Sequence, residues 1–336
     1  MTAIEIVPYD REWEAAHTEF ARRTFPGKAR RADPTYQRWE YRAADSGPVD
    51  GLLLAVMEGR VVGQLGLLPG KAMVGGVPGP IQWTGNLMVE RELRREGIAS
   101  MLYDVGIART APTFGTDPSP AAAKTLASLG FDQHEASHAM VLTLQAGPVL
   151  ATRYPQLARV APLVTLAGRP ATRLLSRRLV AGRRSDRAQV CSWRDVVDDV
   201  AAAEAAMVED HAIHDEEFLA WRCTGLDGWV REVEAVRTVA GSFALLDRAG
   251  PRMLVHQWHA VDEDEAAAVF GRALFIAEGY GFAYIQVHAG DDAERSMLTR
   301  LGFRARRHCV DLWAYPAGSV GTGRFRVELY DTDSNL

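Results

Sequence analysis

Residues 86–99, Asn-Leu-Met-Val-Glu-Arg-Glu-Leu-Arg-Arg-Glu-Gly-Ile-Ala, pass from an apolar run through a charged loop to a glycine. The run from Ile81 to Val89 predicts a β-strand, because its bulky apolar side chains favour extended backbone. From Gly97 onwards apolar residues recur with a helical period, so we expect a helix to begin at or just before this glycine. The stretch therefore predicts a strand, a short polar loop and a helix in direct succession.

The loop of this unit has the chemistry of a phosphate site. In Arg94-x-x-Gly97-x-Ala99 the two small residues let a ligand approach the backbone N–H groups closely. A helix N-terminus adds unpaired N–H groups and the positive end of the helix dipole. The sequence therefore predicts that an anion binds where this helix begins.

The same residues resemble a known signature. Val89 followed by Arg94-Arg95-Glu96-Gly97-Ile98-Ala99 is similar to the pyrophosphate-binding motif of GNAT acetyltransferases, Gln/Arg-x-x-Gly-x-Gly/Ala after the fourth strand. In that family the loop amides hold the diphosphate of acetyl-CoA, and the strand backbone pairs with its pantetheine arm. The resemblance implies that acetyl-CoA is the acyl donor and that its site is formed by Leu87, Met88, Val89, Arg94, Arg95, Glu96, Gly97, Ile98, Ala99 and Ser100.

A second motif lies further along the chain. A predicted strand, 113–116, and a predicted helix, 119–129, lead to Leu129-Gly130-Phe131 and then to an apolar run, 139–144. The Leu-Gly-Phe tripeptide at this place is also a hallmark of the GNAT family. The alternative is an ordinary strand–turn–helix with a capping glycine, and two motifs in the right order favour the GNAT interpretation.

The second half of the sequence repeats the first. The segment 214–221, His-Asp-Glu-Glu-Phe-Leu-Ala-Trp, echoes 33–39, Asp-Pro-Thr-Tyr-Gln-Arg-Trp, where Asp33 is the expected helix cap. Leu301-Gly302-Phe303 repeats the closing tripeptide of the first half. We therefore expect an α/β fold with two GNAT-like domains, each a mixed, mostly antiparallel sheet flanked by helices: a CoA-binding domain at 1–147, a basic connector at 148–190 and a degenerate domain at 191–336.

The two copies differ at the phosphate loop. Where the first half has Arg94-x-x-Gly97-x-Ala99, the second has Val261-Asp-Glu-Asp-Glu265. Four acidic side chains would repel a diphosphate. Only the first copy is expected to hold CoA, and the second is expected to shape the acceptor pocket.

Acyl transfer to an amine requires a neutral amine, a polarised thioester carbonyl and a stabilised thiolate. The resemblance assigns polarisation to a backbone amide in the region 87–89. Many GNAT enzymes protonate the thiolate with a tyrosine four residues before the Gly-Phe pair, but this chain has Leu126 and Leu298 there. The family's asparagine at the start of that helix falls on Ser119, which would hydrogen-bond the pantetheine or act only as a helix cap.

Several residues are candidates for the general base. Glu90 directly follows the strand, where some relatives carry a catalytic carboxylate, although it would also suit a solvent-facing loop. Asp117 is expected at the end of the fifth strand, and its alternative role is to begin a turn at Asp-Pro. His256 and His259 lie on the strand of the second copy that corresponds to 81–89. They are three residues apart, so they point to opposite faces and at most one can line a given pocket.

Aromatic residues and the chain end add further expectations. Trp39, Tyr41, Trp83 and Trp221 are read as core residues rather than as a ligand platform. Strand alternation would place Trp83 on one face with Leu87 and Val89. An ordered C-terminal tail would bring Asp331 or Asp333 into the cleft and favour cationic acceptors, whereas tails are commonly disordered.

Between the halves, residues 153–187 contain nine arginines and one acid, Asp186. A basic amphipathic segment of this kind can bind a membrane surface or a phosphate-rich partner. The simpler interpretation is a helical connector whose apolar side packs between the domains, interrupted by Pro155, Pro162 and Pro170.

Composition excludes several classes of protein. A formal charge of −5 argues against general nucleic-acid binding. Three cysteines without a Cys-x-x-Cys pair predict reduced thiols, no zinc or other metal site, and a cytoplasmic protein. Neither a signal peptide nor an apolar run long enough to span a membrane is expected.

We expect an N-acyltransferase that moves an acetyl group from acetyl-CoA directly to a primary amine of a small molecule, such as an amino sugar or a specialised metabolite. Two alternatives remain open at this stage. One is a GNAT-like enzyme acting on carrier-protein thioesters, with the arginine-rich segment docking an acidic carrier protein. The other is a non-catalytic acyl-CoA-binding protein, which the two leucines in place of tyrosine would suit.

Overall fold

The computed structural model describes residues 3–42, 49–109, 112–145, 147–148, 154–160, 163–164, 185–321 and 324–329. It confirms the α/β class, with helices on both faces of a mixed sheet. Most of the connector and the tail that carries Asp331 and Asp333 lie outside the described residues, so the expectations for them stay predictions. Within the described part, no helix is long and apolar enough to cross a membrane.

The helices and strands of the first half include, in the predicted order, those expected from residue 81 onwards. They are β1 (Ile4–Tyr9), α1 (Glu14–Thr24), α2 (Pro34–Glu40), β2 (Val49–Met57), β3 (Arg60–Val74), β4 (Val77–Val89), α3 (Ile98–Ile107), β5 (Thr113–Thr116), α4 (Pro120–Ser128) and β6 (Asp132–Thr143). Short 3-10 helices lie at η1 (Ala29–Ala32) and η2 (Arg91–Leu93).

The second half has corresponding elements, together with a short strand, β8, that the sequence patterns did not predict. Its elements are β7 (Ala188–Ser192), α7 (Val197–Ala205), β8 (Asp210–Ile213), α8 (Glu216–Thr224), β9 (Glu234–Thr238), β10 (Phe243–Ala249), β11 (Arg252–His259), α9 (Glu263–Tyr280), β12 (Tyr284–Ala289), α10 (Asp292–Arg300), β13 (Arg304–Tyr315) and β14 (Phe325–Arg326). The 3-10 helices are η3 (Pro155–Val160), η4 (Ser185–Arg187) and η5 (Trp193–Val196).

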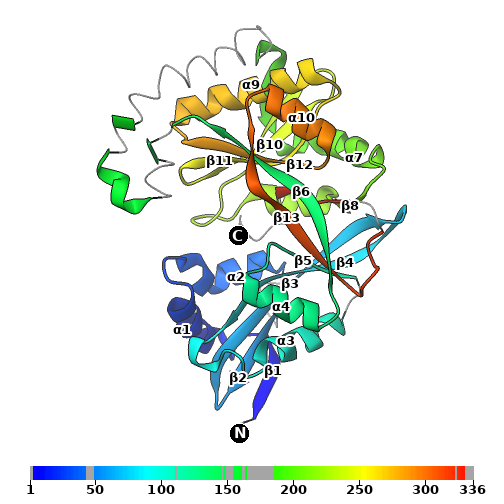
Figure 1. Cartoon of the computed structure of the whole chain (residues 1–336). Coiled ribbons are helices and arrows are strands. Elements are labelled where there is room, and N and C mark those ends of the chain that lie inside the picture. Colours follow the sequence, from blue (N-terminus) through cyan, green and yellow to red (C-terminus); the bar gives the residue numbers. More distant parts are fainter. Residues whose placement is uncertain are drawn as a thin grey trace.

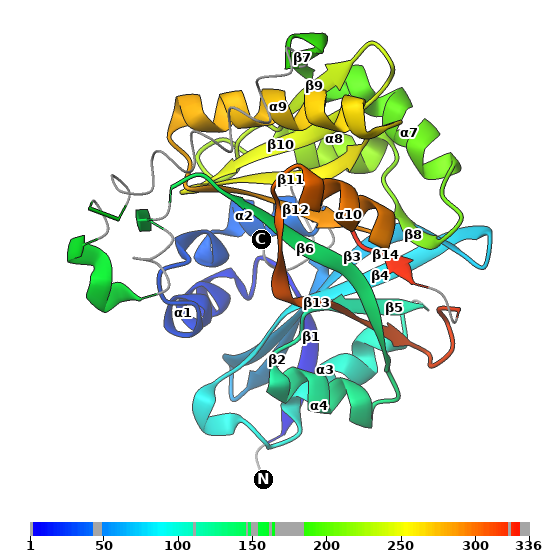
Figure 2. The same ribbon diagram turned by 45° about the horizontal axis from the view of Figure 1, so that its top comes forward.

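The two halves share one continuous sheet because each contributes one long strand, β6 or β13, to the other. The strand order is β1-β2-β3-β4-β5-β13-β6-β12-β11-β10-β9-β7. Strand β13 pairs with β5 of the first half, and β6 pairs with β12 of the second, while β6 and β13 also pair antiparallel with each other. The two long strands cross between the lobes in Figure 1 and Figure 2. The sheet of each half therefore includes a strand from outside its predicted range, 1–147 or 191–336.

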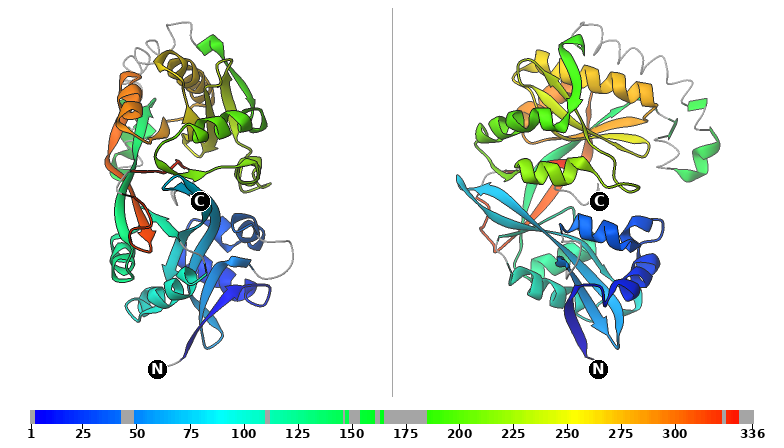
Figure 3. Two further views of the ribbon diagram at one scale, coloured as in Figure 1. Left: turned by 90° about the vertical axis from the view of Figure 1, so that its right-hand side faces the viewer. Right: turned by 180° about the vertical axis from the view of Figure 1, so that it is seen from behind.

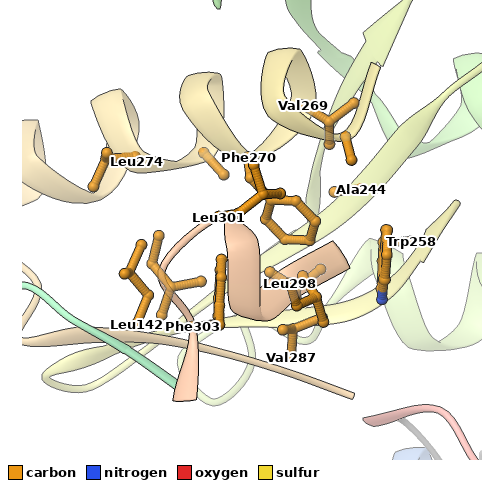
Figure 4. Close-up of a cluster of buried hydrophobic side chains, with 14 of the residues drawn as sticks. Leu142, Ala244, Trp258, Val269, Phe270, Leu274, Val287, Leu298, Leu301 and Phe303 are labelled. Carbon is orange, nitrogen blue, oxygen red and sulfur yellow. The ribbon is translucent and has the colours of Figure 1, made fainter. Parts of the chain in front are cut away.

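This exchange places first-half side chains in the core of the second half. Met140 and Leu142 of β6 are fully buried in the cluster that α9 and α10 form with β10, β11 and β12. Figure 4 shows Leu142 beside Phe303 in this cluster. Burial of such side chains stabilises each lobe by about 1.5–3 kcal/mol per residue, so the lobes are energetically coupled.

Helices cover the sheet in the same way in both halves. In the first half α1 contributes Phe20 to one buried cluster, and α3 and α4 contribute Leu102 and Leu126 to another. In the second half η5, α7 and α8 cover one face, and α9 and α10 the other. The two views in Figure 3 show the lobes from the side and from behind.

The echo between 33–39 and 214–221 has a direct structural basis. Asp33 caps α2 by accepting from the Tyr36 N–H at 3.0 Å, and Asp215 caps α8 by accepting from the Phe218 N–H at 2.9 Å. The two tryptophans that follow lie against each other with ring centroids 6.1 Å apart. Trp221 Nε1 also donates to the Trp39 carbonyl at 2.7 Å. The repeated motif therefore forms a contact between the two halves.

The expectation that Trp83 shares a face with Leu87 and Val89 is wrong. Strand β4 carries a bulge, because Gly85 pairs with Gly66 whereas Met88 pairs with Gln64. Asn86, within the bulge, has a φ of 54°. One extra residue inverts the alternation of side chains. Trp83 therefore packs with Phe114 and Phe325 on one face, while Leu87 and Val89 contribute to the core beneath α3.

Candidate functional site

Strands β4 and β5 separate and leave a cavity between them. They pair in parallel only at Gln82–Thr113, Trp83–Phe114 and Thr84–Gly115. At the last pair a Cβ on Gly115 would lie 2.8 Å from Thr84 Oγ1, so a larger residue there would require the Thr84 side chain to move. Beyond it lies the β4–β5 cavity, of about 250 Å³, lined by Thr84–Leu87, Gly115–Ser119, Phe25, Lys28, Tyr103, Ala122 and Leu126.

The β4 bulge on the wall of this cavity is held by a network of hydrogen bonds. Asn86 Nδ2 donates to Tyr41 Oη at 3.0 Å and to Glu40 Oε1 at 3.3 Å. Gln64 Nε2 donates to the Asn86 carbonyl at 3.2 Å. Since that carbonyl only accepts, the Gln64 amide oxygen faces His17 and accepts from its Nε2–H at 3.0 Å. The network fixes which backbone groups of β4 face the cavity.

Helix α3 begins at the predicted phosphate loop, with Gly97 as its N-cap at φ 80°. Glycine has no side chain to cap the helix, so the N–H groups of the first turn have no intrahelical acceptor and no capping oxygen. Arg94 and Gly97 are exposed, whereas Ile98 is buried beneath the helix. Arg94 Nε donates to the Val89 carbonyl at 3.3 Å, which ties the loop to the end of β4.

The corresponding helix of the second half is closed to an anion. Asp262 caps α9 by accepting from the Glu265 N–H at 2.8 Å. Its first turn contains Glu263, Asp264 and Glu265. A carboxylate thus occupies the place that a phosphate would take, which agrees with the expectation from the sequence.

The split between the equivalent strands β11 and β12 is also filled. These strands pair only from Arg252–Tyr284 to Val255–Val287, as β4 and β5 do over a short stretch. The Trp258 indole then bridges the gap, donating from Nε1 to the His288 carbonyl at 2.8 Å. The C-terminal segment covers the opening, since the Val327 carbonyl lies 3.2 Å from His288 Nδ1. The two halves therefore share a strand arrangement, but in the second half the Trp258 indole spans the place where the first half has its cavity.

Two predicted residues, Asp117 and Ser119, lie with Leu87 on the wall of the β4–β5 cavity. Asp117 Oδ1 accepts from the Asp311 N–H at 3.0 Å, and the Asp117 N–H donates to the Asp311 carbonyl at 2.9 Å. Asp117 thus ties the end of β5 to the exchanged strand β13. Ser119 Oγ accepts from the Ala122 N–H at 3.3 Å, so it does cap α4.

The other three candidate bases, Glu90, His256 and His259, lie outside the lining of this cavity. Glu90 is nearly buried and forms ion pairs with Arg23 at 2.7 Å and Arg60 at 2.9 Å, outside the cavity lining. His256 lies 3.3 Å from Asp247 Oδ2 and lines a different cavity between the two halves. None of these residues is brought to the β4–β5 cavity, and their catalytic roles stay predictions.

The leucines in place of the usual tyrosine are core residues. Leu298 is fully buried in the second-half cluster shown in Figure 4, and Leu126 of α4 is buried at the edge of the β4–β5 cavity, which it also lines. The cavity wall instead carries a phenol from α3, Tyr103, and an amine, Lys28, after α1. The sequence patterns identified neither residue, because neither belongs to a recognisable motif. Tyr103 is an ordinary position of a helix, and Lys28 lies in the loop after another helix.

The network behind the bulge predicts a pH dependence of stability. Burial lowers the pKa of His17 to about 4, against the opposing effect of its hydrogen bond to Gln64. As the pH falls below about 6.5, the unfolded chain binds a proton that the folded protein does not, so stability is lost on acidification. Between pH 7 and pH 4.5 we expect His17 to reduce the free energy of unfolding by about 2–3 kcal/mol.

Urea unfolding at the two pH values, in wild type and His17→Gln, measures this contribution. Glutamine can keep a hydrogen bond to Gln64 and cannot titrate. The variant should lose less stability on acidification than the wild type. An identical loss in both proteins would contradict the assignment to His17.

Comparisons with known proteins support the fold. No family model and no curated protein matches the sequence. A solved GCN5-related N-acetyltransferase from Kribbella flavida is 14% identical with a TM-score of 0.59, and the alignment covers 95% of this chain and 72% of that one. Saccharomyces cerevisiae N-myristoyltransferase with bound myristoyl-CoA is 9% identical with a TM-score of 0.57, covering 94% of this chain and 83% of that one.

A third solved structure is similar over the same length. It is a probable N-acyltransferase, described as a conserved protein of unknown function, from Enterococcus faecalis V583. It is 12% identical with a TM-score of 0.57, covering 95% of this chain and 74% of that one. At these identities the likeness concerns the fold alone. The chain has the GNAT fold, as its sequence motifs predicted.

Proposed function

We propose that the protein is an N-acyltransferase that takes a short acyl group, acetyl in the first instance, from its CoA thioester and transfers it to a primary amine of a small molecule. The observation that carries the proposal is the difference between the halves. The first has an open cavity between β4 and β5 and an uncapped helix N-terminus at Gly97. The second has both places filled, by Trp258 and Asp262.

Each part of the first half has a role in this proposal. The N–H groups at the start of α3 hold the diphosphate of the acyl donor. The backbone of β4 between Leu87 and Val89 lies beyond its last pair with β5 and can pair with the pantetheine arm. A β4 amide in this region polarises the thioester carbonyl, as oriented backbone donors do in acyl transfer.

The remaining chemistry falls to the cavity wall. The acceptor must arrive as a neutral amine, and its nitrogen forms the new amide bond as the carbon–sulfur bond breaks. The nitrogen loses one proton to solvent, and the solvent returns a proton to whichever group has protonated the thiolate. Tyr103 is the proposed source of the proton that the departing thiolate takes up, in place of the family tyrosine that Leu126 replaces. A cavity of about 250 Å³ is smaller than the usual ligand pocket of roughly 300–1,000 Å³, so we expect it to take a short acyl chain.

The test is calorimetric titration with acetyl-CoA and myristoyl-CoA, followed by release of free CoA in the presence of a panel of primary amines. We expect micromolar binding of acetyl-CoA, weaker binding of myristoyl-CoA, and amine-dependent release of CoA that is reduced in Tyr103→Phe. Binding without turnover across the panel would favour the non-catalytic alternative. Absence of binding would exclude the proposal.

A further inference from the structure

The β4–β5 cavity extends from one face of the first-half sheet to the other. Along β2, Leu52 belongs to the buried cluster beneath α1, and its neighbour Leu53 to the cluster beneath α3 and α4. Since successive strand residues point to opposite faces, the two clusters lie on opposite sides of the sheet. Side chains from both clusters line the cavity, with Leu126 on the α3–α4 side and Phe25 on the α1 side. The cavity is therefore a passage through the sheet between the two strands.

The backbone of Phe25 is held at the α1 end of this passage. Its N–H donates to the Ala21 carbonyl at 2.9 Å as α1 ends, and its carbonyl accepts from the Lys28 N–H at 3.0 Å. Pro26 and Gly27 lie between, and Gly27 has a φ of 81°. Proline at the second position and a glycine of positive φ at the third define a type II turn. The half-buried Phe25 ring thus projects from a fixed backbone against the α1 cluster.

The proposed acyl donor approaches the passage from the opposite face. Helix α3, whose start we assign to the diphosphate, contributes Ile98 to the α3–α4 cluster. Leu87 and Val89, on the stretch of β4 that we assign to the pantetheine arm, contribute to the same cluster. With the arm on this face, the acyl chain extends through the passage toward the other face. The side chain that it meets there is Phe25.

We propose that Phe25 sets the upper limit on the length of the acyl chain that the protein accepts from CoA. The proposal rests on the function proposed above and names the residue that selects among its donors. With the ring in place the cavity holds about 250 Å³, and the turn fixes the backbone from which the ring projects. A methylene group that a closed pocket cannot accommodate weakens recognition by about 10- to 200-fold. Donors longer than acetyl-CoA therefore meet a graded penalty.

The experiment is calorimetric titration of acetyl-CoA, butyryl-CoA and hexanoyl-CoA into wild type, Phe25→Leu and Phe25→Ala, which requires no acceptor amine. We expect the wild type to bind hexanoyl-CoA at least about tenfold more weakly than acetyl-CoA. Phe25→Ala should keep the acetyl-CoA affinity within about threefold and bind hexanoyl-CoA about tenfold or more tightly than wild type does, because the chain fills the vacated space. Phe25→Leu should give intermediate values.

Two further variants make the result specific. Phe25→Trp enlarges the ring and should weaken butyryl-CoA binding more than acetyl-CoA binding, opposite in direction to Phe25→Ala. Phe275→Ala makes the same truncation on α9, where the ring is 60% exposed and lies outside the cavity lining, and should bind all three donors as the wild type does. Urea unfolding shows which variants are folded. Phe25→Leu keeps a large apolar side chain against the α1 cluster, so it tests the chain preference even if Phe25→Ala unfolds.

The outcomes separate this inference from the proposed function. If the wild type binds none of the three donors, the proposed donor site is wrong and the role of Phe25 is overturned with it. If acetyl-CoA binds but the ratio of hexanoyl-CoA to acetyl-CoA affinity is the same in all the Phe25 variants and the wild type, the donor site stands and only the role of Phe25 is overturned. A change of that ratio in Phe275→Ala as large as in Phe25→Ala would also overturn it.

Discussion

Replacing Gly97 with glutamate is expected to weaken acetyl-CoA binding by at least about 100-fold, since a carboxylate near a bound phosphate costs up to about 4 kcal/mol in a surface environment. Gly97 is the N-cap of α3, and an added Cβ would meet no atom within 4 Å. The new side chain therefore has room to lie over the N–H groups that we assign to the diphosphate. Calorimetric titration of wild type and variant measures the difference directly.

Backbone strain has to be separated from charge in this experiment. Gly97 has a φ of 80°, a conformation that costs other residues roughly 1 kcal/mol or more. Gly97→Asn is the matched control, because asparagine tolerates this conformation and adds similar bulk without charge. It should retain binding within about tenfold of wild type.

A third variant tests whether the second half contributes. Asp262→Ser removes the carboxylate at the start of α9 but keeps a capping oxygen. We expect acetyl-CoA affinity to be unchanged in this variant. If Gly97→Glu bound acetyl-CoA like wild type, while Asp262→Ser altered the affinity, the donor site would belong to the second half and our assignment would be wrong.

Local sequence signals predicted the elements around the site well. The small residues of the phosphate loop, the helix that follows it and the Asp33 cap are short-range features, and each depends on residues only a few positions apart. The degenerate phosphate loop of the second half was also evident from its acids. These features need no knowledge of the rest of the fold.

Features that depend on distant residues could not be predicted in this way. The apolar runs ending β6 and β13 have the same pattern, and nothing local indicates that each pairs with the other half. The bulge at Asn86 is held by side-chain hydrogen bonds to Glu40, the last residue of α2, and to Tyr41, which follows it. Glu90 was a candidate base by position, but Arg23 and Arg60 come from separate elements to pair with it.

Removing the carboxylate of Glu40 is expected to destabilise the protein by about 3–5 kcal/mol, the usual effect of removing one member of a buried ion pair. Arg31 and Glu40 are 1% and 0% exposed, and Arg31 Nη1 donates to the two carboxylate oxygens at 2.6 and 2.5 Å. In Glu40→Ala the Arg31 guanidinium stays buried without this counter-charge. Urea unfolding of wild type and variant gives the difference in free energy.

The surface pair Arg23–Glu19 is the natural control. Its side chains are 41% and 76% exposed, so Glu19→Ala should cost less than about 1 kcal/mol. The double variant Arg31→Met with Glu40→Leu should recover much of the loss, because it removes both charges and fills their space. A Glu40→Ala cost no larger than that of Glu19→Ala would show that Arg31 finds another partner or solvent.

The same variant connects stability to the site. Glu40 Oε1 also accepts from Asn86 Nδ2, which lines the β4–β5 cavity at the bulge. Loss of this acceptor should loosen the backbone that we assign to thioester polarisation, while the start of α3 at Gly97 is untouched. Under conditions where Glu40→Ala is still folded, we therefore expect acyl transfer to fall more than acetyl-CoA affinity. If acyl transfer and acetyl-CoA affinity fell by the same factor, Glu40 would act through folding alone.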